Sequence, residues 1–164
     1  MPFNIIKKNP SPGEITTSLI NSTDGAGLHF DGTSGNIDIA SPPDLGTKFS
    51  FEFVIQADSW ADSTEKYLID FGVGGRFIIG TNSAAGAKLS IYDNVGWKTF
   101  GVSPIDDLKV HHIVVTVDGT AAILYDNGNQ VGTATISASH AIDSCTDASI
   151  GSDYVGTNQF FNGT

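Results

Sequence analysis

The sequence contains a single cysteine, Cys145, and few positively charged residues. One cysteine cannot form a disulfide within the chain, so the fold does not depend on oxidation. Eight Lys and Arg residues stand against eighteen Asp and Glu residues, which gives a formal net charge of −10. A field of this sign repels phosphate backbones and anionic lipid surfaces. We therefore expect no nucleic acid partner and read the acidic surface first as a source of solubility.

Long apolar runs and helical periodicity are also missing. No run approaches the roughly 20 apolar residues that are needed to cross a bilayer. The first eight residues place their apolar side chains before Lys7 and Lys8, which is the reverse of a secretory signal. We expect a soluble chain with no signal peptide and no membrane insertion. No stretch long enough for a helix of three turns shows a helical period, which argues against helical folds.

Short alternating segments separated by turn residues fill the rest of the chain. Of 164 residues, 19 are glycine, 40% are apolar and only 16% are charged. The strongest segment, 49–56, places four apolar residues on one face and Glu52 on the other. Segments 111–117, 121–125 and 130–136 follow one another with Asp-Gly and Asn-Gly turns between them. This pattern predicts an all-β, two-sheet antiparallel sandwich. Its predicted core includes Phe51, Phe53, Ile113, Val115 and Leu124.

The order of four segments resembles the laminin-G-like branch of the concanavalin-A-like lectin and glucanase jelly rolls. The segments are 27–32, 49–53, 110–119 and 122–128. The last two are the most specific, because paired histidines, a threonine and an Asp-Gly turn precede an apolar strand that ends in an aromatic residue. The resemblance implies a jelly-roll domain over residues 24–164. An N-terminal arm with a candidate first strand, residues 1–23, precedes it.

Two departures from the family pattern bear on assembly. Val110 stands where the family usually has tryptophan, and the sequence stops after Phe160–Gly163, where the family adds another strand. A longer product, the arm or another subunit would then complete the sheet, because an open apolar edge invites association. We expect self-association, or contacts with neighbouring structural proteins, through the arm or the C-terminal tail. The apolar residues of the arm are Phe3, Ile5, Ile6, Ile15, Leu19 and Ile20.

No catalytic constellation is visible in the sequence. His111 and His112 are adjacent on a predicted strand and point to opposite faces, so they cannot readily share one metal. Glycanases of the broader fold use two or three acidic residues on one strand, whereas Glu52 is alone on its strand. The sequence therefore predicts a protein that is not an enzyme.

The resemblance also implies that calcium can be bound by an aspartate and loop carbonyls, ligands that suit a hard cation. The candidate metal ligands are Asp31, Asp93, Asp118, Asp126 and Asp153. Three of these precede or lie in Asx-Gly turns, where aspartate also serves by bonding to its own backbone. Both interpretations stay open at this point.

Two clusters offer the aromatic platform that sugar binding needs, since one face of a pyranose is apolar and its edge is polar. The first is Trp60 with Asp62. The second is Trp97 with Tyr92, Asp93 and Asn94. A packing role for each tryptophan is the competing interpretation.

Three functions compete on this basis. The first is a non-catalytic recognition or adhesion module that binds a glycan or a protein and is displayed on a larger assembly, such as a phage particle. The second is a purely structural protein that decorates a virion surface without a ligand. The third is a glycan-active enzyme. Fold alone does not rank them.

Overall fold

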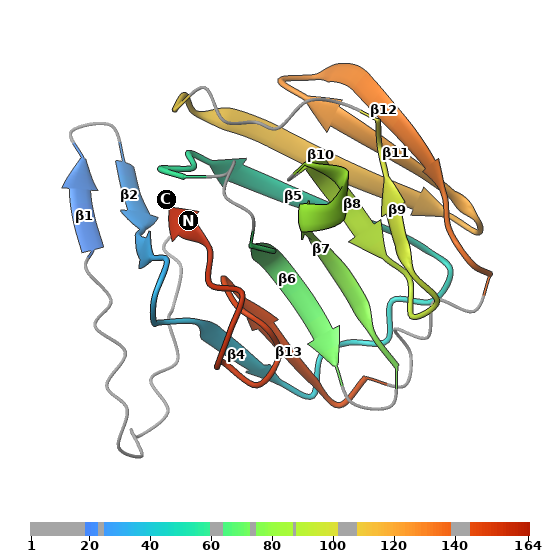
Figure 1. Ribbon diagram of the computed structural model, residues 1–164, viewed down its shortest axis with the longest axis horizontal. Coiled ribbons are helices and arrows are strands. Elements are labelled where there is room, and N and C mark those ends of the chain that lie inside the picture. Colours follow the sequence, from blue (N-terminus) through green and yellow to red (C-terminus); the bar gives the residue numbers. More distant parts are fainter. Residues whose placement is uncertain are drawn as a thin grey trace.

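Two antiparallel sheets face each other in the computed structural model, and strands account for nearly all of its regular structure (Figure 1). The structure describes residues 19–22, 25–59, 64–72, 75–86, 88–101, 108–138 and 145–164. One short 3₁₀ helix, η1 (Ser83–Ala85), lies between two strands. The predicted all-β sandwich is confirmed. In the described part of the chain, no helix is long and apolar enough to cross a membrane.

The four-stranded sheet has the order β12-β11-β10-β5. Its strands are β5 (Lys48–Ile55), β10 (His111–Asp118), β11 (Ala121–Asp126) and β12 (Asn129–Thr135). The last three form two successive hairpins with tight turns, as the Asp-Gly and Asn-Gly signals predict. Among the described strands β5 pairs with β10 alone, and it therefore forms one edge of this sheet.

The six-stranded sheet has the order β4-β13-β6-β7-β8-β9. Its strands are β4 (Ile37–Ala40), β6 (Tyr67–Gly72), β7 (Phe77–Asn82), β8 (Lys88–Tyr92), β9 (Trp97–Thr99) and β13 (Asp147–Ile150). Every residue of β6 and β7 is buried, so the centre of this sheet is covered on both faces.

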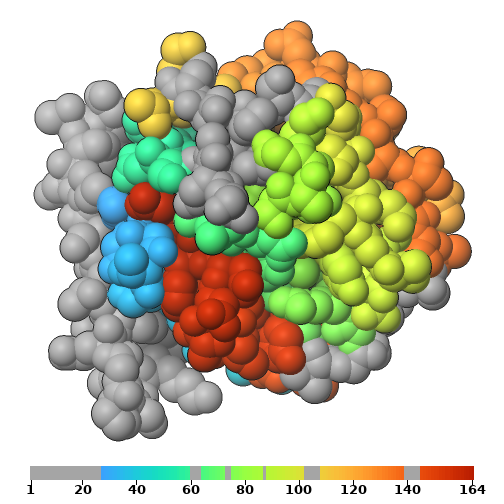
Figure 2. All heavy atoms as spheres, viewed as in Figure 1, coloured from blue at the N-terminus to red at the C-terminus, as the bar shows by residue number. Residues whose placement is uncertain are grey.

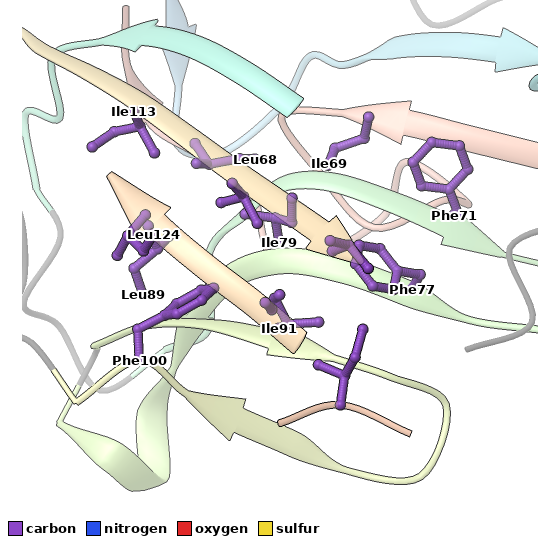
Figure 3. Packing of buried hydrophobic residues seen from close by; sticks show 14 of the residues in the cluster. Leu68, Ile69, Phe71, Phe77, Ile79, Leu89, Ile91, Phe100, Ile113 and Leu124 are labelled. Carbon is purple, nitrogen blue, oxygen red and sulfur yellow. The ribbon is translucent and has the colours of Figure 1, made fainter. Parts of the chain in front are cut away.

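The core lies between the two sheets, where alternate side chains of each strand meet (Figure 3). The five predicted core residues all lie there: Ile113, Val115 and Leu124 are fully buried, and Phe51 and Phe53 pack against them. Aromatic contacts join the sheets, since the ring of Phe51 lies 5.6 Å from that of Phe71. Cys145, the single cysteine of the chain, is buried, in keeping with a small hydrophobic residue.

The C-terminal residues return to the sandwich. β14 (Asn162–Gly163) pairs with β3 (Phe30–Asp31). Beyond β14, the amide and carbonyl groups of Thr164 bond to those of Gln56, at 2.8 and 2.7 Å. The backbone of this tail is thus paired within the chain.

A hairpin of β1 (Leu19–Ser22) and β2 (Gly25–Leu28) stands beside the sandwich (Figure 1). It contains the only part of the predicted N-terminal arm, residues 1–23, that the structure describes. Residues 1–18 and Thr23 lie outside the described residues, so contacts of the arm with other chains stay a prediction.

The packing of the C-terminal residues against Gln56 can be tested by adding one methyl group at Gly163. Gly163 has a φ of +145°, and a Cβ atom there would lie 2.1 Å from the carbonyl oxygen of Gln56. We expect Gly163→Ala to lower the free energy of unfolding by at least about 2 kcal/mol, because it adds a backbone clash to an unfavourable φ. Denaturant unfolding measures this change.

Gly35→Ala is the matched control. Gly35 also has a positive φ, +92°, but no atom lies within 4 Å of the position of its Cβ. It should cost only about 1 kcal/mol for the backbone conformation. Equal losses in the two variants would show that the tail does not pack against Gln56 as described.

Candidate functional site

The outer face of the six-stranded sheet carries a row of side chains that crosses five of its six strands. Strand register aligns Ser149, Asp70, Ile78, Tyr92 and Trp97 on neighbouring strands, one residue from each of β13, β6, β7, β8 and β9. Phe71 and Ile79 lie at alternate positions and point into the core, so the residues of this row point outward. Figure 2 shows residues 64–101 and 145–164 side by side on one face of the molecule.

An ion pair lies within this row. The Arg76 guanidinium binds the Asp70 carboxylate at two points: Nη2 to Oδ2 at 2.8 Å and Nε to Oδ1 at 3.3 Å. The Asp70 side chain is fully buried, whereas 35% of the Arg76 side chain is exposed. The amide of Tyr154 donates a further bond to Asp70 at 3.1 Å. Both carboxylate oxygens of the buried Asp70 therefore accept hydrogen bonds, from Arg76 and from the Tyr154 amide.

The pKa values of this pair reflect burial and pairing together. Burial raises the pKa of Asp70 above its ordinary value, and the Arg76 guanidinium and the Tyr154 amide act against that rise. The hydrogen bond to Asp70 raises the pKa of Arg76. Because the guanidinium keeps its charge at any physiological pH, it fixes a cation on this face of the sheet.

Two tyrosines lie close to the Arg76 guanidinium. The guanidinium carbon lies 5.7 Å from the centre of the Tyr67 ring and 5.5 Å from that of Tyr154, which are cation–π distances. Tyr154 reaches this position because Gly72, beneath its ring, has no side chain: a Cβ at Gly72 would lie 2.1 Å from the ring. The glycine thus makes room for the aromatic layer.

The aromatic layer continues to the edge strand β9. The Tyr67 ring lies 6.0 Å from the ring of Trp97, which in turn makes an edge-to-face contact with Tyr92 at 5.6 Å. Trp97 and Tyr92 are half-buried, so they present part of their ring surface to solvent. Tyr67 is buried, and its hydroxyl donates to Glu65 at 2.7 Å. Burial, together with this bond, raises the pKa of Tyr67.

We call Tyr67, Arg76, Tyr92, Trp97 and Tyr154 the aromatic platform. It is continuous from Tyr154 through Arg76 and Tyr67 to Trp97 and Tyr92. Its rings are tilted relative to one another, and the half-buried rings of Tyr92, Trp97 and Tyr154 offer apolar surface near one fixed cation. This surface suits the stacking of a flat or apolar ligand face.

Comparison with known families identifies the superfamily of this chain. A laminin G profile of the concanavalin A-like lectin/glucanases superfamily matches residues 31–164. The chain belongs to that superfamily. A search of curated proteins gives no match. Membership supports, at a coarse level, a module that binds carbohydrate or protein, although the superfamily also includes glycosidases.

The concanavalin A-like domain brings together only part of the predicted sugar sites. Tyr92 and Trp97 lie on the aromatic platform. Asn94 is exposed in the β8–β9 turn with a φ of +67°. Trp60 and Asp62 lie outside the described residues. Sequence reasoning missed Tyr67, Arg76 and Tyr154, because their separation along the chain gives no local signal.

Asp93, a candidate for both sugar and calcium, is buried and turned into the fold. It accepts hydrogen bonds from the amides of Val95, Gly96 and Ser137 at 3.1, 3.0 and 2.7 Å. Burial acts to raise the pKa of Asp93, but these amides hold it below its ordinary value. Asp93 thereby connects the β8–β9 turn to the segment after β12.

Two other predicted calcium ligands organise their own turns. Asp31 accepts bonds from the amides of Thr33 and Ser34, which lower its pKa to about 2. Asp153 accepts bonds from the amides of Thr157 and Asn158 at 2.7 and 3.0 Å. Both carboxylates act as Asx-type acceptors of the kind that aspartate favours in turns.

The remaining two predicted calcium ligands are paired with basic side chains. Asp118 lies 2.9 Å from the Lys48 ammonium, and Asp126 lies 2.9 Å from Nδ1 of His111. Within the described residues, no three His, Cys, Asp or Glu side chains gather closely enough to hold a metal ion. The five aspartates therefore do not come together at one site, and calcium binding stays a prediction.

The paired histidines separate as predicted, and Glu52 has a partner that the sequence did not suggest. His111 bonds to Asp126, whereas the more exposed His112 places Nε2 2.7 Å from Glu52 on the outer face of the four-stranded sheet. Strand register explains the contact. Glu52 lies opposite Val114, and Val114 and His112 are two residues apart and therefore on the same face of β10, so Glu52 and His112 are diagonal neighbours.

A hollow of about 240 Å³ also opens beside the C-terminal residues. None of the described residues that line it carries a charged side chain, and this part of the wall suits an apolar group better than a sugar or a cation. It is lined by Gly27, Leu28, Phe30, Phe53, Val54, Ile55, Leu68, Ile150, Gly151, Phe161 and Thr164.

The Asp70–Arg76 pair of this concanavalin A-like domain can be tested by a double-mutant cycle. Asp70→Asn should lower the free energy of unfolding by about 1–3 kcal/mol, because it weakens a buried, charge-assisted network. Arg76→Gln should also destabilise the fold, and the double variant should lose less than the sum of the two. Denaturant unfolding of all four proteins measures the coupling. Additive losses would contradict a direct interaction.

Proposed function

We propose that this domain is a non-catalytic recognition module that binds neutral glycans on the aromatic platform. The observation that supports it is the continuous layer of Tyr67, Arg76, Tyr92, Trp97 and Tyr154 on the outer face of one sheet. The apolar face of a pyranose stacks on such rings, while polar groups at their border bind its hydroxyls.

Polar side chains border the exposed rings. Thr99 is half-buried in the next outer row, where its hydroxyl oxygen lies 3.2 Å from that of the fully buried Ser90. Asn94 is exposed in the turn beside Trp97. These hydroxyl and amide groups both donate and accept hydrogen bonds, as sugar hydroxyls require.

Charge favours neutral over acidic glycans. The chain carries a formal charge of −10, so its field repels carboxylated and sulfated sugars. The cations near the platform are already compensated, Arg76 by Asp70 and Lys98 by Asp93, whose carboxylate lies 3.6 Å from the Lys98 ammonium. A neutral sugar meets no such repulsion.

The same contacts argue for binding without turnover. Asp70 is held by Arg76 and Asp93 by three backbone amides, so neither carboxylate is positioned to protonate a leaving group. Glu52, the remaining carboxylate of interest, lies on the other sheet and binds His112. We therefore propose that bound glycans leave the domain uncleaved.

Replacing one ring tests the site. Trp97→Ala should weaken binding of a neutral glycan at least about tenfold, because stacking on aromatic rings contributes strongly to such complexes. Trp97→Phe should restore part of it. The measurement is a neutral-glycan array followed by titration calorimetry of the best ligand, with calcium and with chelator. Chelator should change nothing, because the proposed contact uses no metal ion.

Tyr125→Ala is the matched control, because Tyr125 is a half-buried aromatic residue on the outer face of the four-stranded sheet. It should bind as the wild type does. If Tyr125→Ala lost binding and Trp97→Ala kept it, the site would lie on the four-stranded sheet and the proposed position would be wrong. Release of shorter sugars during the titration would contradict the non-catalytic part of the proposal.

A further inference from the structure

The free edge of β5 is long and regular. β5 pairs with β10 on one side over all eight of its residues, and no described strand pairs with its other side between Lys48 and Ile55. Thr164 pairs with Gln56 just beyond the end of β5. An exposed edge of this length readily accepts another strand.

Hydrogen-bond parity identifies which backbone groups face this edge. Gln56 and Asp58 bond to the C-terminal tail on the free side, whereas the Thr47 carbonyl accepts from Gly119 on the β10 side. Because the direction alternates along a strand, the amide and carbonyl groups of Lys48, Ser50, Glu52 and Val54 point away from β10. They are in position to form a further ladder.

The inward side chains beside this edge are incompletely covered. Phe49, Phe51 and Phe53 are only half-buried, whereas Ile113, Val115 and Val117 on neighbouring β10 are buried. All of them face the same core. The half-exposed rings therefore add apolar surface that a strand placed beside β5 would cover.

The charges of β5 match those of a second, antiparallel copy. Its two ionised side chains are Lys48 and Glu52, which are 73% and 70% exposed and lie on the outward face. An antiparallel pairing centred on Ser50 puts Lys48 of each copy opposite Glu52 of the other. It also pairs Phe49 with Phe51 on the inward face. A pairing centred on Glu52 would instead oppose two carboxylates.

We propose that two copies of this chain associate through β5, with a two-fold axis at Ser50, and join their four-stranded sheets into one continuous sheet. Backbone bonds at positions 48, 50 and 52 and the covered phenylalanine rings hold the copies together. The Lys48–Glu52 pairs select the register. The interface is isologous, as a symmetric dimer requires.

Charge reversal tests the register. Sedimentation of the full chain over a concentration series should show a shift from one to two chain masses. In a dimer of Glu52→Lys, Lys48 of each copy faces a lysine at position 52 of the other copy. In a dimer of Lys48→Glu, Glu52 of each copy faces a glutamate at position 48 of the other. Each variant alone should dimerise at least about tenfold more weakly.

Mixing the two variants provides the rescue. In the mixed dimer every reversed charge faces an opposite one, so association should return towards the wild-type constant. Circular dichroism should show both single variants folded, because the two side chains are exposed. A mixture that stays as weak as the single variants, or a Glu52→Lys variant that dimerises as the wild type does, would overturn the proposal.

Ser50→Pro gives a second, independent test. The Ser50 amide points to the free edge, so proline removes no bond to β10 but blocks the ladder at the axis. This variant should remain folded and monomeric. A wild type that is monomeric at all concentrations, with slow hydrogen exchange at Ser50, Glu52 and Val54, would show that another part of the same chain covers the edge and would refute the proposal.

Discussion

The structure depends on the mutual burial of alternate side chains from two facing sheets. β10 places Ile113, Val115 and Val117 inward, and these meet residues such as Ile79 and Leu89 from the six-stranded sheet (Figure 3). This constraint fixes the register of each strand, since a slip of one residue would turn every apolar side chain to solvent. It also determines which residues remain on the outer faces.

The packing of the core therefore also determines which residues lie on the outer face of the six-stranded sheet. Once Phe71 and Ile79 point inward, Asp70 and Ile78 must point outward, where both are nevertheless fully buried. Arg76 neutralises Asp70, and the rings of Tyr67 and Tyr154 lie at cation–π distance from Arg76. The same side chains thus serve stability and offer the surface proposed for glycan binding, so substitutions there will affect both unless the fold is monitored independently.

Much of the fold could be predicted from local sequence. The Phe49–Ile55 alternation and the Asp-Gly and Asn-Gly turns each specify a strand or hairpin within a few residues, and the predicted core residues lie where expected. The aromatic platform could not be predicted as a whole. Asp70 and Arg76 meet because β6 pairs with β7, and Tyr154 joins them because β13 pairs with β6. The space that Gly72 leaves for Tyr154 has no sequence signature. The prediction that Asp93 binds a ligand rested on its loop position, which suggests exposure. In the structure Asp93 is buried and accepts hydrogen bonds from three backbone amides.

The most direct test of recognition on this face is to map a bound neutral glycan by NMR on the isotope-labelled full chain. The platform places the ligand against Trp97 and Tyr92, so the indole and ring signals of these residues and the amides of β8 and β9 should shift on titration. Signals of β10 and β11, on the opposite sheet, should stay unchanged. Shifts confined to the four-stranded sheet, or to the turns that hold Asp31 and Asp153, would contradict the assignment of the platform as the binding surface.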